Sequence, residues 1–564
     1  MPVTYAEKPW LKHYDQGVPA EMEFENTTLV DAFDETVANY PDRVAFYFMG
    51  TELKYRDFGD AVNRLAAALT SFGIKKGDSV AIILPNVIPA AIGYYAILKI
   101  GGIVVMNNPL YSDRELEHQL TDSKSKVVIT LDLLANRIID LRPKNMVTQI
   151  ITTTIGDYLP FPKSFLFKLF GKKKGVKADV KPAENVYRFK ELLKNNAPRT
   201  NAEPITYDDL AMYQYTGGTT GVSKGVMLSH GNLGKQVQQM DGWVTGFGKE
   251  EYEVVMGALP MFHVYGLTCI LAMSVSAGWG IILVPKPQPD ELMEAIRRYR
   301  PTFLSLVPTM FIGLLQHPDI NKTDLTFVKR CFSGSAPLPI EVMKDFEERT
   351  QTNIAEGFGM TETSPVTHSA PFDGIRKQGS IGVPIMNTGC RIVDLETGTK
   401  DMPVGEEGEV IIQGPQVMQG YLNRPDATAE TIRDGWLYTG DIGKMDEDGY
   451  FYIVDRKKDM ILSGGYNVYP REIDEVLYEN PKIAEACAVG IPHPKRGEQI
   501  KAFIVLNEGE TADAEEIIEY CRTKLAVYKL PTMVEFRKEL PKSTVGKVLR
   551  KELRKEEMEQ AATA

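Results

Sequence analysis

Short apolar runs rich in β-branched residues alternate with helical patterns from about residue 28 to about residue 380. Strands that alternate with helices favour parallel sheets, because each crossover helix returns the chain to the end of the sheet where the next strand begins. We therefore predict a large body of layered α/β subdomains. The runs are SVAIIL (79–84), KVVITL (126–131), QIITTT (149–154), EVVMGAL (253–259), GIILV (280–284), TFLSLV (302–307) and VKRCFSG (328–334).

The sequence pattern changes at about residue 388, and the new pattern continues to residue 455. Its short strand-like runs have few helical patterns between them, and the Asp-Gly pair in MDEDGYFYI (445–453) is typical of a hairpin. We predict a β-rich subdomain at about 388–455, which completes an N-terminal domain of residues 1–455.

Strand and helix patterns resume after the charged segment RKKD (456–459), with Pro470 in the first turn of a helix. Residues 456–564 are predicted to form a small, mobile α+β cap domain, with a hinge at about 455–459. The fold class is thus α/β, with a large N-terminal domain and a small C-terminal one.

The acidic balance of the chain argues against a nucleic-acid partner. The 64 basic and 75 acidic side chains give a net charge of −11, whereas nucleic-acid-binding proteins gather Lys and Arg to neutralise phosphates. The five cysteines include no CxxC pair, which is typical of a reducing compartment and indicates neither a disulfide framework nor a thiolate zinc site. The first 17 residues lack the apolar run of a signal peptide, so we expect a cytoplasmic protein.

Two apolar stretches have the composition of membrane spans. In 80–98, Pro85 and Pro89 would break a helix, and in 264–285 two glycines precede a strand-like run. We expect a buried strand followed by a helix in the first stretch, and helix, turn and strand in the second. A membrane-anchored nucleotide-binding protein is the alternative.

The segment 158–177, YLPFPKSFLFKLFGKKKGVK, has six lysines, five aromatic residues and no acid. Apolar side chains interleaved with lysines suit a segment that lies on an anionic membrane, because ring burial and attraction to lipid headgroups add together. One expectation is therefore peripheral contact with the inner membrane face. The other is a surface loop whose aromatic side chains cover the body while its lysines are solvated.

The strongest local motif is YTGGTTGVSKG (215–225), with its run of glycines, threonines and one lysine. Glycines let backbone N–H groups converge on an anion, hydroxyls add donors, and Lys224 adds a positive charge. The spacing does not match a Walker A loop, which would need glycine at 223 and Ser or Thr at 225. We interpret the motif as a phosphate-binding loop, with a flexible turn as the alternative.

This loop resembles the nucleotide-binding signature of the acyl-adenylate-forming superfamily. Further segments resemble the motifs of that superfamily in order along nearly the whole chain, and the texture of GPQVMQGYLNRP (414–425) is most similar to bacterial or archaeal long-chain fatty acid CoA ligases. The resemblance implies that ATP and a fatty acid form acyl-AMP and pyrophosphate, after which CoA displaces AMP. The segments are MFHVYG (261–266), SGSAP (333–337), GFGMTE (357–362), YTGD (438–441), DRKKD (455–459), SGGYN (463–467) and PKSTVGK (541–547).

The resemblance also implies a nucleotide site assembled from several motifs. Phe358 would stack on adenine, and the Asp441 carboxylate would accept hydrogen bonds from both ribose hydroxyls. Glu362, with Thr216, would bind Mg²⁺, a hard cation that needs only one or two protein carboxylates when it bridges phosphates. The implied ATP- and AMP-binding residues are Thr216, Gly217, Gly218, Thr219, Thr220, Gly221, Lys224, Gly334, Ser335, Ala336, Glu356, Gly357, Phe358, Thr361, Asp441, Arg456 and Lys547.

The implied catalytic residues are Lys547, Glu362 and Thr216. Lys547 would stabilise charge on the α-phosphate and the carboxylate. Taken singly, Glu362 and Lys547 would be ordinary surface charges, so their roles rest on the motifs around them. Because Lys547 lies in the cap and Thr216 in the large domain, adenylation requires closure. The family then rotates the cap about a hinge at Lys458, so that Gly464 and Gly465 line the path of the CoA thiol.

His263 and Tyr265 fall in the family's acyl-binding segment, with residues 334–336 as another wall. Peptide-synthetase adenylation domains commonly carry aspartate after the phenylalanine, so His263 after Phe262 argues against an amino acid substrate. The chain also departs from the family pattern, with Ser223 at the usual proline of the loop and Leu267 where some relatives carry a tryptophan gate.

Several functions share these motifs. The main interpretation is a long-chain fatty acid CoA ligase, with a medium-chain or aryl (4-coumarate-like) CoA ligase as the alternative. A luciferase-like oxidase and a carrier-loading adenylation module are further options. The oligomeric state is left open, with a dimer as one option.

Overall fold

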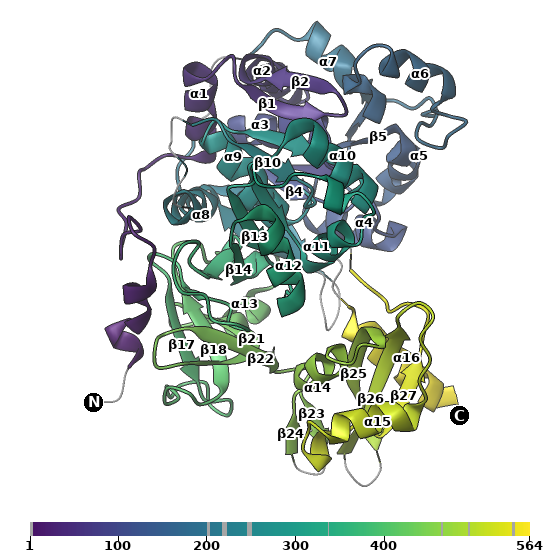
Figure 1. Ribbon diagram of the computed structural model, residues 1–564. Helices are drawn as coiled ribbons and strands as arrows, with labels where there is room; N and C mark the ends of the chain where they lie inside the picture. The colour runs from purple at the N-terminus through teal and green to yellow at the C-terminus, as the bar shows by residue number, and fades with distance from the viewer. Residues whose placement is uncertain are drawn as a thin grey trace.

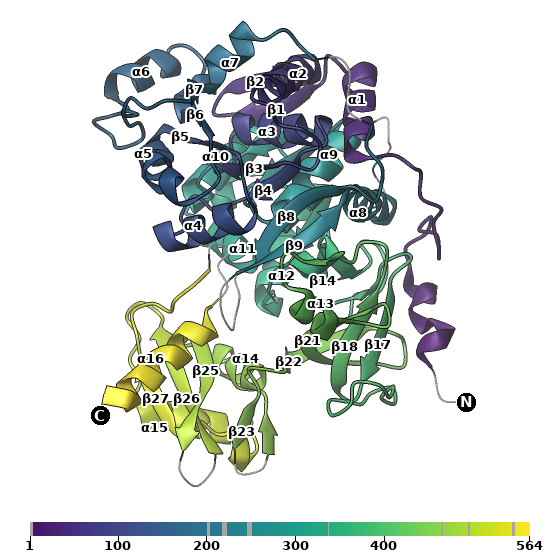
Figure 2. The same cartoon turned by 180° about the vertical axis from the view of Figure 1, so that it is seen from behind.

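The computed structural model describes residues 4–199, 204–216, 223–244, 247, 251–336, 338–463, 466–493, 497–543 and 548–563. A large N-terminal domain is followed by a small C-terminal domain, which lies beside the β-rich part of the large domain in both views (Figures 1 and 2). The predicted two-domain α/β organisation is confirmed.

An eight-stranded sheet carries the N-terminal half of the large domain (Figure 2). In spatial order its strands are β19 (Gly420–Tyr421), β9 (Lys224–Ser229), β8 (Leu210–Thr216), β4 (Ile103–Met106), β3 (Ser79–Ile83), β5 (Val127–Leu131), β6 (Gln149–Thr153) and β7 (Val186–Arg188). Its strands β4, β3, β5 and β6 pair in parallel, and three of them lie in the predicted runs at 79–84, 126–131 and 149–154.

A nine-stranded sheet forms the other α/β subdomain. Its central strands pair in parallel and include the four predicted runs between 253 and 334. In spatial order its strands are β16 (Val383–Pro384), β15 (Val366–Ser369), β14 (Ile354–Gly359), β13 (Arg330–Ser333), β12 (Phe303–Leu306), β10 (Val254–Gly257), β11 (Gly280–Leu283), β1 (Val44–Phe48) and β2 (Thr51–Lys54).

The expectation of parallel pairing is wrong at the edges of both sheets. The pairs β1–β2, β8–β9, β14–β15 and β15–β16 are antiparallel. The connections between the first three pairs are too short for a crossover helix, and a parallel return needs a dozen or more residues. Hairpins therefore close the edges of the parallel core.

Helices cover and separate the two sheets. Every residue of α3 is buried, including Lys99, whose Nζ lies 2.6 Å from Asp34 Oδ1. In the large domain the helices are α1 (Leu29–Asn39), α2 (Tyr55–Ser71), α3 (Ile88–Lys99), α4 (Asp113–Asp122), α5 (Asp132–Leu141), α6 (Lys163–Phe170), α7 (Phe189–Asn195), α8 (His230–Trp243), α9 (Met273–Ser276), α10 (Pro289–Tyr299), α11 (Pro308–Leu315), α12 (Ile340–Thr350) and α13 (Pro425–Thr431).

Both apolar stretches are interior layers, as predicted. The first is β3 followed by α3, and the second is a π-helical segment at Tyr265–Ala272, then α9, a turn at Gly278 and β11. In the part of the chain that the structure describes, no helix is both long enough and apolar enough to cross a bilayer. All five cysteines are buried and free of disulfide bonds.

The β-rich segment forms an antiparallel sheet with the predicted hairpin at its end. Its strands are β17 (Gly389–Val393), β18 (Gly408–Gln413), β21 (Trp436–Met445), β20 (Ile432–Arg433) and β22 (Phe451–Arg456). One part of this segment departs from it, because β19 pairs with β9 of the eight-stranded sheet and is followed by α13. This excursion brings residues of the β-rich segment to the loop motif.

The small domain is a mixed sheet with three helices. A helix does begin at Pro470, as predicted. The strands are β24 (Tyr466–Val468), β23 (Ile461–Ser463), β26 (Gly497–Leu506), β25 (Ile483–His493) and β27 (Met533–Phe536), and the helices are α14 (Pro470–Tyr478), α15 (Ala514–Arg522) and α16 (Arg550–Thr563).

Candidate functional site

The base of the predicted phosphate loop is a β-hairpin. β8 ends at Thr216 and β9 begins at Lys224, and these two residues are partners in the antiparallel register. Thr216 Oγ1 donates a hydrogen bond to the Lys224 carbonyl at 3.5 Å. The hairpin thus places the hydroxyl and the ammonium at one end of the eight-stranded sheet. Gly217, Gly218, Thr219, Thr220 and Gly221 lie outside the described residues.

Ser223, which replaces the usual proline, is held by α4. The His118 ring Nε2 lies 3.0 Å from the Ser223 carbonyl oxygen, and Gln119 Nε2 donates to Ser223 Oγ at 3.3 Å. These contacts fix the end of the loop from outside, so the serine gains through side-chain contacts the restraint that proline would have supplied through its ring.

Glu362 lies beside this hairpin in a short turn that follows β14, the 3₁₀ turn Thr361–Thr363. Its carboxylate is buried, and Oε1 accepts a hydrogen bond of 2.7 Å from the Tyr421 hydroxyl. The Lys224 ammonium lies 4.0 Å from the centroid of the same Tyr421 ring. The structure therefore brings Lys224 and Glu362 to one tyrosine, with Lys224 over its ring and Glu362 at its hydroxyl.

Tyr421 is a residue that the motif analysis missed. It belongs to the GPQVMQGYLNRP segment, whose texture suggested the family but no role for the side chain. The Gly-Tyr pair has no pattern that marks it as a site residue. Its position follows from the pairing of β19 with β9, which cannot be deduced from local periodicity.

The residues 334–336 and 356–358 lie at adjacent strand ends of the nine-stranded sheet. β13 and β14 are parallel neighbours in which Ser333 pairs with Glu356, so both groups lie at the carboxyl end of this parallel pair, where β14 continues and pairs with β15. Ligands bind at that end of the strands in open α/β sheets. A Cβ on Gly334 would lie 3.0 Å from the Tyr265 ring, and a Cβ on Gly357 would lie 2.1 Å from the Phe332 ring, so neither position has room for a side chain.

The side chains at this end have distinct environments. Glu356 Oε1 accepts a hydrogen bond of 3.0 Å from the Leu338 N–H, and burial raises the pKa of the Glu356 carboxyl. Ser335 is exposed with a positive φ of 73°, and Ala336 and Phe358 are half-buried. The Phe358 side chain is therefore partly accessible.

The acyl-binding segment leaves β10 of the same sheet. The Tyr265 hydroxyl accepts a hydrogen bond of 3.0 Å from Ser305 Oγ, and its ring packs against Gly334. Burial lowers the pKa of His263 to about 4, so this side chain is neutral at physiological pH. Leu267 is fully buried in the core, so the position at which some relatives carry a gate faces the interior here.

Two amides that the motif analysis missed hold this segment in place. The buried Asn86 side chain donates to the carbonyls of Gly257 (3.0 Å) and Leu259 (2.8 Å) and accepts from the Met261 N–H (2.9 Å). Gln214, two residues before Thr216, donates to the Phe262 carbonyl at 2.9 Å. A buried amide that satisfies three backbone groups rigidifies its surroundings. The acyl-binding segment is thereby linked to the phosphate loop.

Asp441 and Arg456 face each other on the hairpin β21–β22. They are register partners, and Arg456 Nε lies 3.1 Å from Asp441 Oδ1. The Asp441 side chain is buried, whereas Arg456 is half-exposed. The Asp441 carboxylate is thus held in place by Arg456, which belongs to the predicted hinge segment.

The predicted hinge, at about 455–459, begins at the end of β22 and continues in a turn at 457–459. Burial, with a contribution from the Arg456 charge, lowers the pKa of Lys458 to about 8. Arg550 of α16 forms an ion pair with Asp474 of α14, and its Nη1 lies 3.6 Å from Asp459 Oδ2. The end of the hinge is therefore anchored to the small domain, whereas Arg456 is anchored to the large one.

Three predicted residues of the small domain, Lys547, Gly464 and Gly465, lie outside the described residues. The described strands on either side of 464–465, β23 and β24, lie at the end of the small domain away from the large domain (Figure 1). The described chain between β27 and α16 rises towards the large domain in both views.

The donor chemistry fits a magnesium ion that is held mainly by a nucleotide. The described residues contain no group of three or more His, Cys, Asp or Glu side chains that would form a protein-only metal site. Glu362 offers one buried carboxylate beside the phosphate loop, and its Oε2 accepts no hydrogen bond from a described residue. Mg²⁺ typically binds through one or two carboxylates plus substrate phosphates.

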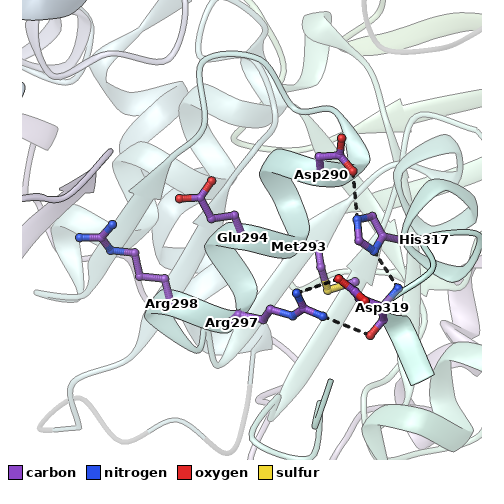
Figure 3. Close-up of a pocket in the computed structure, with 7 residues that line it drawn as sticks. All are labelled: Asp290, Met293, Glu294, Arg297, Arg298, His317 and Asp319. Atoms are coloured by element: carbon purple, nitrogen blue, oxygen red, sulfur yellow. Dashed lines mark hydrogen bonds and ion pairs between the residues drawn. The ribbon is translucent and has the colours of Figure 1, made fainter. Parts of the chain in front are cut away.

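A surface hollow on another face is not part of this site (Figure 3). It is lined by charged side chains of α10 and of the chain after α11. His317 Nε2 lies 3.0 Å from Asp290 Oδ1, and Arg297 Nη1 lies 3.0 Å from Asp319 Oδ2. These four side chains thus contact one another in two pairs, and none of the lining residues belongs to a predicted motif.

Comparison with known proteins agrees with this geometry. Residues 33–422 match the family described as AMP-binding enzyme, and residues 472–547 match the AMP-binding enzyme C-terminal domain. The chain is 46% identical over 560 residues to a long-chain-fatty-acid--CoA ligase of Bacillus subtilis (98% of this chain, 99% of that one). It is 37% identical over 553 residues to the enzyme of the same name from Escherichia coli O6:H1 (97% and 98%).

Solved structures show the same fold. ATP-bound MatB from Rhodopseudomonas palustris superposes with a TM-score of 0.82 at 30% identity, covering 93% of this chain and 98% of that one. The two matched segments correspond to the large and the small domain seen here. From the motifs, the assembled site and these matches, the chain belongs to the AMP-binding enzyme family.

Proposed function

We propose that this enzyme is an ATP-dependent long-chain fatty acid CoA ligase. A fatty acid carboxylate attacks the α-phosphorus of ATP, which forms acyl-AMP and releases pyrophosphate. The CoA thiolate then attacks the acyl carbon, which forms the thioester and releases AMP. The observation that carries the proposal is the end-to-end similarity to two curated ligases of that name, combined with the meeting of Thr216, Lys224 and Glu362 at one place.

The large domain is proposed to bind ATP. Thr216, Lys224 and the glycine- and threonine-rich residues between them would hold the phosphates, and Asp441 with Arg456 would hold the ribose. Phe358, flanked by Glu356 and Gly357, would stack on the adenine, and residues 334–336 would form the adjacent wall. Glu362, with Thr216, would hold a Mg²⁺ ion, which when bound neutralises charge on the phosphates.

The small domain is proposed to supply Lys547 to the α-phosphate and then to rotate about Lys458. The orientation of β23 and β24 away from the large domain suits the adenylation step, because the glycines at 464–465 would have to face the site only in the second step. The domain boundaries at 455–456 and the hinge at 455–459 belong to this proposal. The anchoring of Arg550 to Asp474 and Asp459 supports a rigid small domain beyond the hinge.

The acyl chain is proposed to lie beside His263 and Tyr265. Both side chains are neutral in this environment, because burial lowers the pKa of His263 and raises that of Tyr265. A buried CH₂ group contributes about 0.8 kcal/mol, so a dozen methylenes would contribute on the order of 10 kcal/mol. A long apolar chain is therefore a substrate that such a site can hold firmly.

Pyrophosphate release with palmitate, octanoate and 4-coumarate tests the proposal. The expected result is the highest kcat/KM with palmitate. A higher kcat/KM with octanoate or 4-coumarate would instead assign the enzyme to the medium-chain or aryl alternative. Oxygen uptake or light emission in the presence of an acyl adenylate would identify a luciferase-like oxidase.

We also propose that the cytoplasmic enzyme contacts an anionic membrane through α6 and its flanks. Phe161 is 83% exposed and Leu169 is 57% exposed, and Phe165, Leu166 and Phe170 are exposed beside them. Phe167 points inward, because a Cβ on Gly156 would lie 2.2 Å from its ring. The outer face of α6 is therefore apolar and is surrounded by exposed lysines at 163, 168 and 172–174.

The place of α6 in the molecule suits this contact. α6 lies at a corner of the large domain, at the end opposite the small domain, in both views. Within the described residues, Lys168, Lys173 and Lys174 form no ion pair, whereas Lys172 lies 2.5 Å from Asp179. Docking through this corner would leave the small domain free to rotate.

A further inference from the structure

Tyr421 contacts two site residues that come from different motifs. Its hydroxyl donates to Glu362 Oε1 at 2.7 Å, and the Lys224 ammonium lies 4.0 Å from its ring centroid. A lysine ammonium within about 6 Å of an aromatic face is attracted by the ring quadrupole. One side chain therefore restrains both the cation of the phosphate loop and the carboxylate after β14.

The tyrosine itself is held rigidly by its backbone. Tyr421 is the register partner of Val226 in β9, and the Leu422 N–H donates to the Gly225 carbonyl at 2.8 Å. Its own N–H donates to Thr428 Oγ1 at 2.9 Å. The Met418 N–H, three residues earlier, donates to the Glu362 carbonyl at 2.8 Å. These contacts fix the backbone of Tyr421, and the residue is only 5% exposed, so burial restricts the rotation of its ring.

Lys224 and Glu362 contact different parts of Tyr421, the ring face and the hydroxyl. Within the described residues, no ion pair joins Lys224 to Glu362, although both flank the same side chain. A lysine and a glutamate that met here would pair with each other, and both would then be withdrawn from a nucleotide and its metal ion. With Oε1 engaged by the hydroxyl, Oε2 accepts no hydrogen bond from a described residue.

We propose that Tyr421 is a positioning residue that orients Glu362 towards a divalent cation and prevents Lys224 from neutralising it. The hydroxyl fixes the rotation of the carboxylate, and the ring surface holds the ammonium on the side of the phosphate loop. The inference rests on the proposed function only in that the site binds ATP with Mg²⁺.

Two substitutions separate the hydroxyl from the ring. Tyr421→Phe removes the donor and keeps the ring under Lys224, whereas Tyr421→Leu removes both. Tyr14→Phe is the matched control, because the Tyr14 hydroxyl donates to the Pro384 carbonyl at 2.6 Å away from the motif residues. The thermal melting temperature of each variant reports whether it folds.

The test measures the binding of an ATP analogue by calorimetry at increasing Mg²⁺ concentrations. The analogue cannot be cleaved between its α- and β-phosphates. For Tyr421→Phe we expect the Mg²⁺ concentration at half-maximal binding to rise about tenfold, as for the loss of a hydrogen bond to a charged group. Binding at saturating Mg²⁺ should stay within about twofold of wild type. Tyr421→Leu should weaken binding even at saturating Mg²⁺, because Lys224 then pairs with Glu362.

A double-mutant cycle decides whether the hydroxyl acts through the carboxylate. In a Glu362→Gln background, Tyr421→Phe should cause no further change in Mg²⁺ dependence. The proposal is overturned if Tyr421→Phe matches Tyr14→Phe in Mg²⁺ dependence, or if its effect persists undiminished in the Glu362→Gln background. No acyl substrate is present, so these outcomes are distinguishable from a failure of the fatty acid assignment, which the pyrophosphate assay reports.

Discussion

Arg456 Nε lies 3.1 Å from Asp441 Oδ1 across the hairpin β21–β22. This ion pair joins the proposed ribose-binding carboxylate to Arg456, the residue before the turn at 457–459 within the predicted hinge. Asp455, the preceding residue, accepts hydrogen bonds from the N–H groups of Arg456 (2.7 Å) and Arg471 (2.8 Å), the latter from the small domain. The proposed ribose-binding carboxylate and the predicted hinge are therefore joined through adjacent residues.

Asp441→Asn should raise the KM for ATP in pyrophosphate release by about tenfold or more, because a charge-assisted acceptor is lost. The neutral amide also weakens the attachment of Arg456. Asp401→Asn is the control, since Asp401 pairs with Arg391 at 3.1 Å on the surface of the β-rich sheet. Equal KM values in the two variants would argue that Asp441 does not bind the nucleotide.

Lys458→Pro should separate the two half-reactions. Proline fixes φ near −65°, so a rotation that requires this dihedral to change is blocked. We expect the rate of acyl-AMP formation, measured as pyrophosphate release, to stay within about threefold of wild type. The rate of acyl-CoA formation from acyl-AMP should fall by about tenfold or more. Lys458→Ala, which leaves the backbone free, should retain both steps. Comparable losses of both half-reactions in the proline variant would remove the hinge assignment.

Charge reversal on the flank of α6 should abolish binding to anionic vesicles. We expect the Lys172→Glu, Lys173→Glu, Lys174→Glu variant to stop sedimenting with phosphatidylglycerol vesicles, because headgroup attraction contributes about 1 kcal/mol per basic residue. Phe161→Ser with Leu169→Ser should weaken sedimentation through lost apolar burial.

The matched control for this surface carries the same change of charge elsewhere. Lys322, Lys344 and Lys555 are exposed and distant in sequence from α6. Their replacement by Glu should leave sedimentation near the wild-type level. If both triple variants lose binding equally, net charge rather than the α6 surface attracts the vesicles, and if neither does, the membrane contact is wrong.

His230 should contribute to the pH dependence of stability. Burial lowers its pKa to about 4, and neither ring nitrogen has a hydrogen-bond partner among the described residues. Between about pH 6.5 and pH 4 the unfolded chain therefore binds a proton that the folded chain does not, so the free energy of unfolding falls as the pH drops through this window. Below pH 4 both states are protonated and the loss levels off.

Between pH 7 and pH 5, the free energy of unfolding should fall by about 2 kcal/mol less in the His230→Asn variant than in wild type. Urea unfolding at each pH measures this difference. Gln239→Asn, another buried polar change on α8, should keep the wild-type pH dependence. An unchanged pH dependence in His230→Asn would show that this imidazole does not couple to folding in that window.

The parallel strands and the hairpin at 445–453 could be predicted because their signals are local. A run such as SVAIIL is apolar and β-branched throughout, so it is buried on both faces wherever the sheet lies. Asp448 and Gly449 form the turn between β21 and β22 for reasons that lie within four residues. Pro470 begins α14 because its missing N–H costs nothing in a first turn.

The departures have non-local causes. The π-helical geometry at Tyr265–Ala272 has no periodicity that separates it from an α-helix in so apolar a stretch. Asn86 lies far in sequence from the Gly257 and Leu259 carbonyls that it binds, so its role depends on the meeting of two sheets. β19 joins β9 although the residues around it belong to another sheet.

The sequence alone determined the α/β class, the order of the motifs, the two domains and the residue types that the chemistry needs. These features could be deduced because periodicity, helix breakers and motif spacing are properties of short segments. Only the tertiary structure decided which of these residues meet. Tyr421 contacts both Lys224 and Glu362 because two strands distant in the sequence pair, and Arg456 reaches Asp441 because a register places them opposite each other. Such pairings depend on long-range packing free energy, which no local pattern records.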